Sequence, residues 1–151
     1  MKEKGFTLIE LMVVITIIGI LTAIAVPSLL KSLPTTRLRS SAEELKAQLT
    51  IARAKAISEG IQYVALFTNN SDSFSIFKDL NSNEGFDNGE PTISFSFSTG
   101  VTCDSIPATN PSIVVFSPRG DASVFGSVRL TNQRNEKMRV HVVTSGSVIR
   151  Q

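Results

Sequence analysis

The sequence predicts an α+β fold in which one long N-terminal helix packs on an antiparallel β-sheet or a small β-sandwich. Three observations lead to this expectation: an uncharged apolar run from Leu11 to Leu30, an amphipathic helical pattern that follows it, and short alternating β-type runs after Gly60. The chain has 151 residues, so about 120 remain beyond the apolar run, enough for one modest domain.

The apolar run is long enough to cross a membrane. At about 1.5 Å per residue, the 11–30 segment reaches about 30 Å as a helix, the thickness of a hydrocarbon core. Its two helix breakers, Gly19 and Pro27, are tolerated in membrane helices. Lys2 and Lys4 precede it and favour a cytoplasmic amino end, with the remaining chain outside.

One carboxylate, Glu10, lies at the start of this run. An ionisable side chain at membrane depth costs roughly 2.5–3.5 kcal/mol on insertion scales, so it indicates a function and requires a partner. A cleaved secretory signal ending at Ala23-Ile24-Ala25 is the alternative. Against it stand the Glu10 charge and the apolar character that continues to Leu30, whereas a plain membrane anchor gives Glu10 no role.

The stretch Lys4-Gly5-Phe6-Thr7-Leu8-Ile9-Glu10-Leu11 resembles the class III leader of type IV pilins and type II secretion pseudopilins. The resemblance implies that a prepilin peptidase cuts between Gly5 and Phe6 and N-methylates Phe6. It also implies that Glu10 faces the amino terminus of a neighbouring subunit in a filament. The chemistry agrees, because an α-amine with an unperturbed pKa of about 8 is a cation at neutral pH and needs an opposite charge in low dielectric.

The expected organisation follows from this resemblance. We expect a leader at 1–5, a transmembrane and assembly helix at 6–30, an amphipathic helix at 31–60 and a β-rich periplasmic domain at 61–151. The implied location is the bacterial inner membrane and then a pilus or pseudopilus. The implied partners are prepilin peptidase, other pilin or pseudopilin subunits and secreted cargo, with DNA as partner in an alternative interpretation.

The amphipathic helix has an apolar stripe whose members are spaced four, three, four, three and four residues apart, which predicts packing on the sheet of the same chain. Its members are Leu38, Ala42, Leu45, Leu49, Ala52 and Ala56. Pro34 either kinks the helix or begins its second half, and Gly60 ends it. We expect strands near 61–68, 73–78, 92–98, 112–117, 122–130, 138–144 and 147–150.

Three shorter patterns add a second resemblance. The Ala-Arg-x-x-Ala-Ile pattern at Ala52–Ile57, the Phe-x-Pro-x-Gly turn at Phe116–Gly120, and an ending with Gly146 and Arg150 resemble H-class minor pseudopilins and related minor pilins. The implied function is that of a minor pseudopilin in the type II secretion pseudopilus. The alternative is a minor type IV pilin that binds DNA during uptake or primes pilus assembly.

The 79–90 segment places oxygen ligands at positions of the calcium loop pattern. These residues are Asp79, Asn81, Asn83, Asp87 and Glu90. The glycine that the pattern needs at its sixth position is replaced by Glu84, and the flanks read as strands instead of helices. The segment is therefore either a calcium site or a polar hairpin loop without a cofactor.

Basic residues gather in the C-terminal part, and those with a candidate nucleic-acid role are Arg134, Lys137, Arg139 and Arg150. In related DNA-uptake minor pilins a terminal Gly-Arg-x-Arg segment contacts phosphates, whereas this chain has Gly146-Ser147-Val148-Ile149-Arg150. An ordinary solvated basic face is the alternative interpretation.

The sequence indicates a structural protein instead of an enzyme. It has one cysteine, Cys103, one histidine, His141, and no tryptophan. It has no phosphate-binding glycine loop and no Cys/His cluster, and only His141 could serve a nucleophile as base. We expect Cys103 to be a small buried side chain and His141 to lie on a strand.

Overall fold

The computed structural model describes residues 6–105, 112–124 and 126–150, apart from a few side chains at the ends of these ranges. The chain forms two units, Met1–Leu33 and Pro34–Gln151, which we describe separately. Helix α1 (Leu8–Glu59) supplies the regular structure of the first unit and the only helix of the described part of the second.

In the first unit, every described residue from Phe6 to Ser32 is exposed. The helix is long and apolar enough to cross a membrane by length and composition. Thr7 caps its start: the Thr7 hydroxyl oxygen accepts the Glu10 N–H at 3.3 Å, and the Thr7 carbonyl accepts the Leu11 N–H at 3.3 Å. This is the geometry of an N-cap residue followed three positions later by glutamate.

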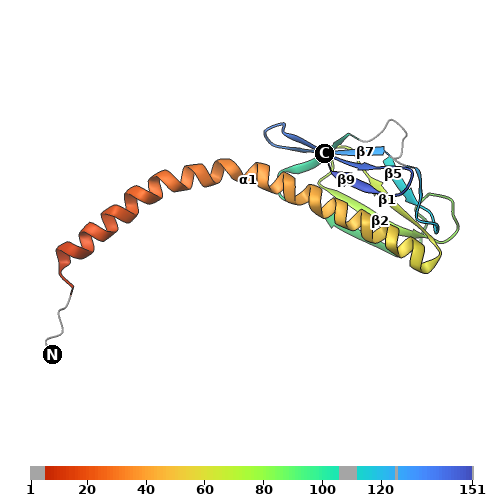
Figure 1. Ribbon diagram of the computed structural model, residues 1–151, viewed down its shortest axis with the longest axis horizontal. Coiled ribbons are helices and arrows are strands. Elements are labelled where there is room, and N and C mark those ends of the chain that lie inside the picture. Colours follow the sequence, from red (N-terminus) through yellow and green to blue (C-terminus); the bar gives the residue numbers. More distant parts are fainter. Residues whose placement is uncertain (1–5, 106–111, 125, 151) are drawn as a thin grey trace, which may run out of the picture. The chain divides into compact units, whose positions relative to one another are not determined.

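The second unit contains two antiparallel sheets (Figure 1). A five-stranded sheet has the order β3-β2-β1-β5-β6, with β1 (Gln62–Phe67), β2 (Ser73–Asp79), β3 (Thr92–Ser96), β5 (Ser112–Phe116) and β6 (Ala122–Val124). A four-stranded sheet has the order β4-β7-β8-β9, with β4 (Val101–Ser105), β7 (Gly126–Asn132), β8 (Lys137–Val142) and β9 (Val148–Arg150).

The predicted apolar stripe of the helix is the centre of the core. All six of its members are buried, and they join one cluster with side chains of both sheets, among them Phe116 and Leu130. Phe74 stacks on Phe67, Phe95 and Phe97 in this core, with ring centroids 5.2–5.5 Å apart. Val64, Phe77 and Val115 form a smaller, separate cluster. They belong to β1, β2 and β5, where their positions alternate with those of residues that face the main core.

The helix ends as expected. Gly60 has φ +68°, and its N–H donates to the Ala56 carbonyl at 3.1 Å, so glycine supplies the left-handed residue after the last turn. Pro34 does not interrupt the helical assignment, although the division between the two units falls there.

The α+β fold is confirmed, with one long helix and antiparallel sheets. Two details of the strand prediction were wrong. The predicted strand at 122–130 is two strands in different sheets, β6 ending at Val124 and β7 beginning at Gly126, and β4 was not predicted. The pattern of apolar residues gives each strand's local geometry but not the sheet that it joins.

Candidate functional site

The N-terminal motif presents its residues openly. Phe6 precedes the helix and is 86% exposed, and Glu10 lies exposed in the first turn, while Gly5 lies outside the described residues. Within the described part of the chain, no ion pair involves Glu10. The carboxylate is therefore available to a group that this chain's described residues do not supply.

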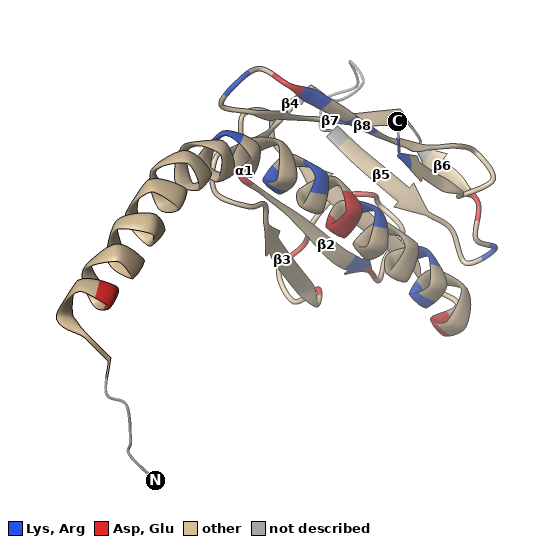
Figure 2. Cartoon of the chain, turned by 60° about the vertical axis from the view of Figure 1, so that its left-hand side comes forward, with Lys and Arg blue, Asp and Glu red and all other residues tan. Residues whose placement is uncertain are grey.

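Charge follows the division into units. Between Glu10 and Lys31 the helix carries no charged residue, whereas its second-unit part carries both signs (Figure 2). An apolar surface without a charged side has no preference for water anywhere on its circumference, which is typical of a helix that is surrounded by lipid or by other apolar helices.

A second constellation lies at the end of the helix. The half-buried Arg53 donates from Nε to the Gly120 carbonyl at 2.6 Å and from a terminal nitrogen to the Ser145 carbonyl at 2.9 Å. We call this group, Arg53 with Gly120, Ser145 and Gly146, the Arg53 clasp. It joins the helix to the turns that follow β5 and β8.

The positive φ of both glycines of the clasp favours glycine, and at Gly146 the close approach of backbone requires it as well. A Cβ on Gly146 (φ +72°) would lie 2.1 Å from the Gly120 carbonyl oxygen, and a Cβ on Gly120 (φ +87°) would lie 2.6 Å from Ile57 Cδ1. The three patterns noted at Ala52–Ile57, Phe116–Gly120 and Gly146 therefore meet at one point, although their spacing in the sequence gave no sign of this.

Glu43 forms a third set of contacts with two arginines. Arg150 of β9 and Arg39 both donate to Glu43 Oε1, the latter at 3.4 Å. These hydrogen bonds, first that of Arg150, hold the pKa of the Glu43 carboxyl below its ordinary value. Arg150 is thus engaged in tying the last strand to the helix, a role that the sequence did not indicate.

The four basic candidates do not form one group. Lys137 and Arg139 are exposed on β8, on side chains that alternate with the buried Val140, and Arg134 lies in the turn before β8. Arg150 is opposite Val140 in the β8–β9 pairing, so it projects from the other face of the sheet. A surface that includes Lys137 and Arg139 on this face of the sheet therefore does not include Arg150.

The 79–90 loop satisfies its own polar groups. The buried Asp79 carboxylate accepts four backbone N–H groups from residues 81–84, at 2.6–3.3 Å. Asp87 Oδ2 accepts the side-chain amides of Asn81 and Asn83 at 2.7 Å each. These contacts join the side chains of the loop to its own backbone and to one another.

Glu90 completes this pattern by accepting N–H groups from Leu80 at 2.9 Å and Asp87 at 3.0 Å. Glu84, at the position where the calcium pattern needs glycine, has φ +62°. The described residues contain no group of three His, Cys, Asp or Glu side chains that could hold a metal. These hydrogen bonds agree with the interpretation as a polar hairpin loop. Calcium binding stays a prediction, which is tested by comparing the melting temperature of the protein with and without millimolar calcium.

The cysteine and the histidine that were considered for catalysis are buried or half-buried on strands. Cys103 is fully buried in the core on β4. His141 is half-buried on β8, opposite Ser127 and Ile149. The two residues lie on different strands, Cys103 on β4 and His141 on β8.

Two family models match the chain. The prokaryotic N-terminal methylation motif matches residues 1–26, and the Type II transport protein GspH family matches residues 41–147. The second match covers more than half of the chain and includes the clasp, strands β1 to β8 and every member of the stripe except Leu38.

Curated relatives match over shorter stretches. A fimbrial protein of Pseudomonas aeruginosa is 42% identical over 74 residues, which are 49% of this chain and 47% of that protein. The pilin-like protein PilA1 of Thermus thermophilus is 37% identical over 92 residues, which are 60% of this chain and 57% of that protein. The chain thus spans about half the length of these relatives.

Solved structures share the fold. The minor pseudopilin EpsH from the type 2 secretion system of Vibrio cholerae has a TM-score of 0.59 at 15% identity, covering 76% of this chain and 96% of that one. The type IV minor pilin FimU of Pseudomonas aeruginosa has a TM-score of 0.61 at 17% identity, covering 78% and 90%. By its match over residues 41–147, the chain belongs to the Type II transport protein GspH family, and it carries the methylation motif of pilin-like proteins.

Proposed function

We propose that the chain is a minor pseudopilin, a structural subunit of the type II secretion pseudopilus. One observation supports this most: the methylation motif at residues 1–26 and the GspH match at 41–147 occur on the same chain. In this role the 6–30 helix holds the subunit in the bacterial inner membrane, the second unit lies in the periplasm, and its exposed sheet surfaces contact other minor subunits or secreted cargo.

Processing at the Gly5–Phe6 bond is the first step of this function. Cleavage there gives Phe6 a new α-amine, which the same peptidase methylates, directly before the turn that Thr7 caps. Sequencing of the mature protein is expected to start at methylated Phe6. A mature protein that starts after Ala25 would contradict the whole proposal.

Glu10 would then set the register between subunits. Its exposed carboxylate neutralises the α-amine of a neighbouring subunit in a low-dielectric filament interior, where an unpaired charge is costly. Glu10→Ala is expected to leave the protein inserted and cleaved but poorly assembled, measured by cross-linking to other filament subunits. Glu44→Ala, which removes an exposed carboxylate from the second unit, is the matched control and should assemble normally.

Normal incorporation of the Glu10→Ala protein into filaments would remove the proposed pairing while leaving the cleavage proposal intact. Loss of both cleavage and assembly would point to a processing defect instead of a missing charge.

The second candidate function is that of a minor type IV pilin. The similarity to a fimbrial protein and to FimU supports it, and so does the pair of exposed cations on β8. Restoration of protein secretion, compared with pilus assembly, in deletion strains of each system would separate the two candidates.

DNA binding within this second candidate has its own test. Filter binding of purified protein at two salt concentrations should show steep salt dependence if phosphates are contacted. The geometry predicts that Lys137→Ala and Arg139→Ala weaken binding more than Arg150→Ala, because Arg150 projects from the opposite face of the sheet. Absence of binding at low salt would eliminate DNA as a partner.

A further inference from the structure

Three of the four sheet edges in the second unit are closed or short. The edge of β4 is covered, since the Cys103 carbonyl accepts the Asn70 N–H at 2.6 Å and the Cys103 N–H donates to the Ser71 carbonyl at 2.8 Å. Both β6 and β9 have three residues. The Ala122 N–H of β6 donates to Thr144, and Arg150 of β9 pairs with Glu43.

Strand β3 forms the remaining edge and has no such protection. It is regular, with five residues paired to β2 without a register shift, and it contains neither a charge nor a proline. Within the described ranges, β3 is the end strand of its sheet. Natural proteins usually protect such an edge with charges, bulges, proline or a covering segment, because it can pair with another chain.

The hydrogen bonds between β2 and β3 show which backbone groups of β3 have no partner in β2. The Lys78 N–H donates to the Pro91 carbonyl at 3.0 Å, and the Phe97 N–H donates to the Asp72 carbonyl at 2.7 Å. Bonding residues alternate along an antiparallel strand, so the odd-numbered residues bond to β2. The backbone N–H and C=O groups of the even-numbered residues, 92, 94 and 96, therefore point to the open edge.

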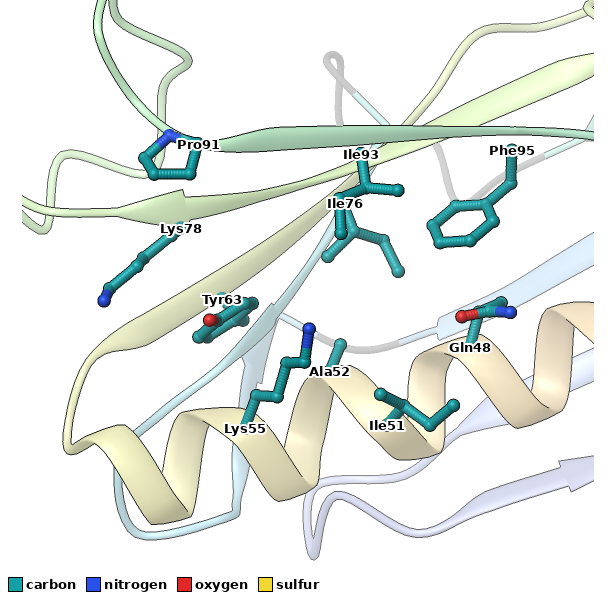
Figure 3. Close-up of a pocket in the computed structure, with 10 residues that line it drawn as sticks. All are labelled: Gln48, Ile51, Ala52, Lys55, Tyr63, Ile76, Lys78, Pro91, Ile93 and Phe95. Carbon is teal, nitrogen blue, oxygen red and sulfur yellow. The ribbon is translucent and has the colours of Figure 1, made fainter.

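A groove of about 160 Å³ runs between β3 and the helix on the core side of the sheet (Figure 3). Ile93 and Phe95 of β3 face Gln48 and Ile51 of the helix across it, above Ala52. Ile93 and Ile51 are 52% and 47% exposed, so apolar surface remains uncovered beside the open backbone groups. Side chains of an added strand that point to this face would bury it.

The two ends of the groove differ in charge. Lys78 and Lys55 line it toward the Pro91 end, where Glu59 is the acidic neighbour, 2.8 Å from the Lys78 ammonium. At the Phe95 end, the polar side chain that lines the groove is the neutral Gln48. Two cations thus line the Pro91 end of the groove, and of these Lys78 forms the ion pair with Glu59.

We propose that the β3 edge binds an extended segment of another protein as an added antiparallel strand. Alternate apolar side chains of that segment fill the groove, and a carboxylate at its C-terminal end lies beside Lys55. An antiparallel added strand has its C-terminal end at the Pro91 end of β3, so a carboxylate at that end lies near Lys55. The proposal does not depend on which filament the subunit serves.

The test uses purified full-length protein in detergent micelles and random nine-residue peptides displayed on phage. Enriched peptides are expected to alternate apolar residues and to carry an acidic residue near their C-terminal end. A synthetic peptide of the enriched sequence should slow amide hydrogen exchange at Ser94 and Ser96. Ser94→Pro removes an outward N–H that β2 does not use and should weaken binding about tenfold or more, whereas Ser94→Thr keeps the N–H and the affinity.

A charge reversal tests the contact between Lys55 and the acidic residue of the added strand. Lys55→Glu should weaken binding of the acidic peptide, while Lys46→Glu, on the same helix but away from the groove, should not. Equal binding by Lys55→Glu and the unchanged protein would overturn the assigned place of the carboxylate beside Lys55.

Other outcomes would overturn the proposal itself. They are the absence of enriched peptides, equal binding by a folded Ser94→Pro protein, or a bound peptide that leaves the exchange of Ser94 unchanged. The hydrogen-exchange measurement uses the unchanged protein, so it tests the proposal even if the Ser94→Pro protein does not fold. Protection of Ser94 and Ser96 in the protein alone that disappears on dilution would show instead that the edge pairs two copies of this chain.

Discussion

The two parts of helix α1 differ in whether their apolar side chains are exposed or buried. From residue 11 to 30 the helix carries no charged residue and is exposed all round. From residue 34 to 59 apolar residues form one stripe, and its six members are fully or almost fully buried. The same secondary structure thus places its apolar surface outward in one unit and inward in the other. Only the second part is stabilised by the fold of this chain, and the first depends on surroundings that the chain does not provide.

The largest expected effect comes from the stripe itself. Leu45→Ala removes a fully buried side chain and should lower the free energy of unfolding of the second unit by about 2–5 kcal/mol. Ile17→Ala, in the exposed part, should change it by less than about 0.5 kcal/mol. Tyr63 is the only tyrosine and there is no tryptophan, so tyrosine fluorescence of the full chain in detergent measures unfolding of the second unit. Equal effects of the two changes would contradict the contrast between the two parts.

The clasp at the end of the second part should be nearly as sensitive. Gly146→Ala forces a side chain against the Gly120 carbonyl in a left-handed conformation, for an expected loss of about 2–4 kcal/mol. Gly60→Ala has almost the same φ but no atom within 4 Å, so it should lose only about 1 kcal/mol. Comparison of the thermal unfolding of both variants separates the effect of the contact with Gly120 from that of the left-handed backbone conformation. Similar losses would mean that the clasp is not tightly packed.

Removal of the arginine should have a smaller effect. Arg53→Ala leaves the Gly120 and Ser145 carbonyls without their charged donor, which should cost about 1–3 kcal/mol. Arg39→Ala removes an exposed ion pair with Glu43 and should cost at most about 0.5 kcal/mol. Denaturant titration of both variants checks the difference. An Arg39→Ala loss as large as that of Arg53→Ala would remove the distinction between the clasp and ordinary surface pairs.

The smallest effect concerns pH. Burial, followed by the hydrogen bond to Glu59, raises the pKa of Tyr63 to about 12 from an ordinary value of 10.0. Because the folded-state pKa is the higher one, this contribution to stability is fully present below pH 10 and is lost as the pH rises toward 12. Absorbance titration should therefore show the tyrosine ionising near pH 12, and Glu59→Gln should lower that midpoint. A midpoint near 10 in the folded protein would contradict the burial of this hydroxyl.

Periodicity was sufficient to predict the helical part of the fold. The spacing of the stripe identified the six buried residues, and Gly60 identified the helix end, because both depend on local geometry alone. The pattern also placed seven strand regions close to observed strands. It could not divide the 122–130 run, although Gly126 was a local sign of a break, because the division depends on which sheet each half joins.

The functional residues show the same limit. The order of residues around Gly5 and Glu10 made the N-terminal motif readable, since its meaning lies in contiguous sequence. Arg53, Gly120 and Gly146 were recognised as separate patterns, but their meeting depends on the packing of two distant turns on the helix. Arg150 was read as a surface cation, and nothing local to it indicates its partner Glu43.

Two contacts described above join very distant positions: Arg53 to Ser145 are 92 residues apart, and Glu43 to Arg150 are 107 apart. Neither can form until those late residues have been synthesised, and contacts of such long range are slow to form. Until then, the second part of the helix lacks these partners of Glu43 and Arg53. The second part of the helix therefore acquires its final contacts only when the last strand of the described chain has been synthesised.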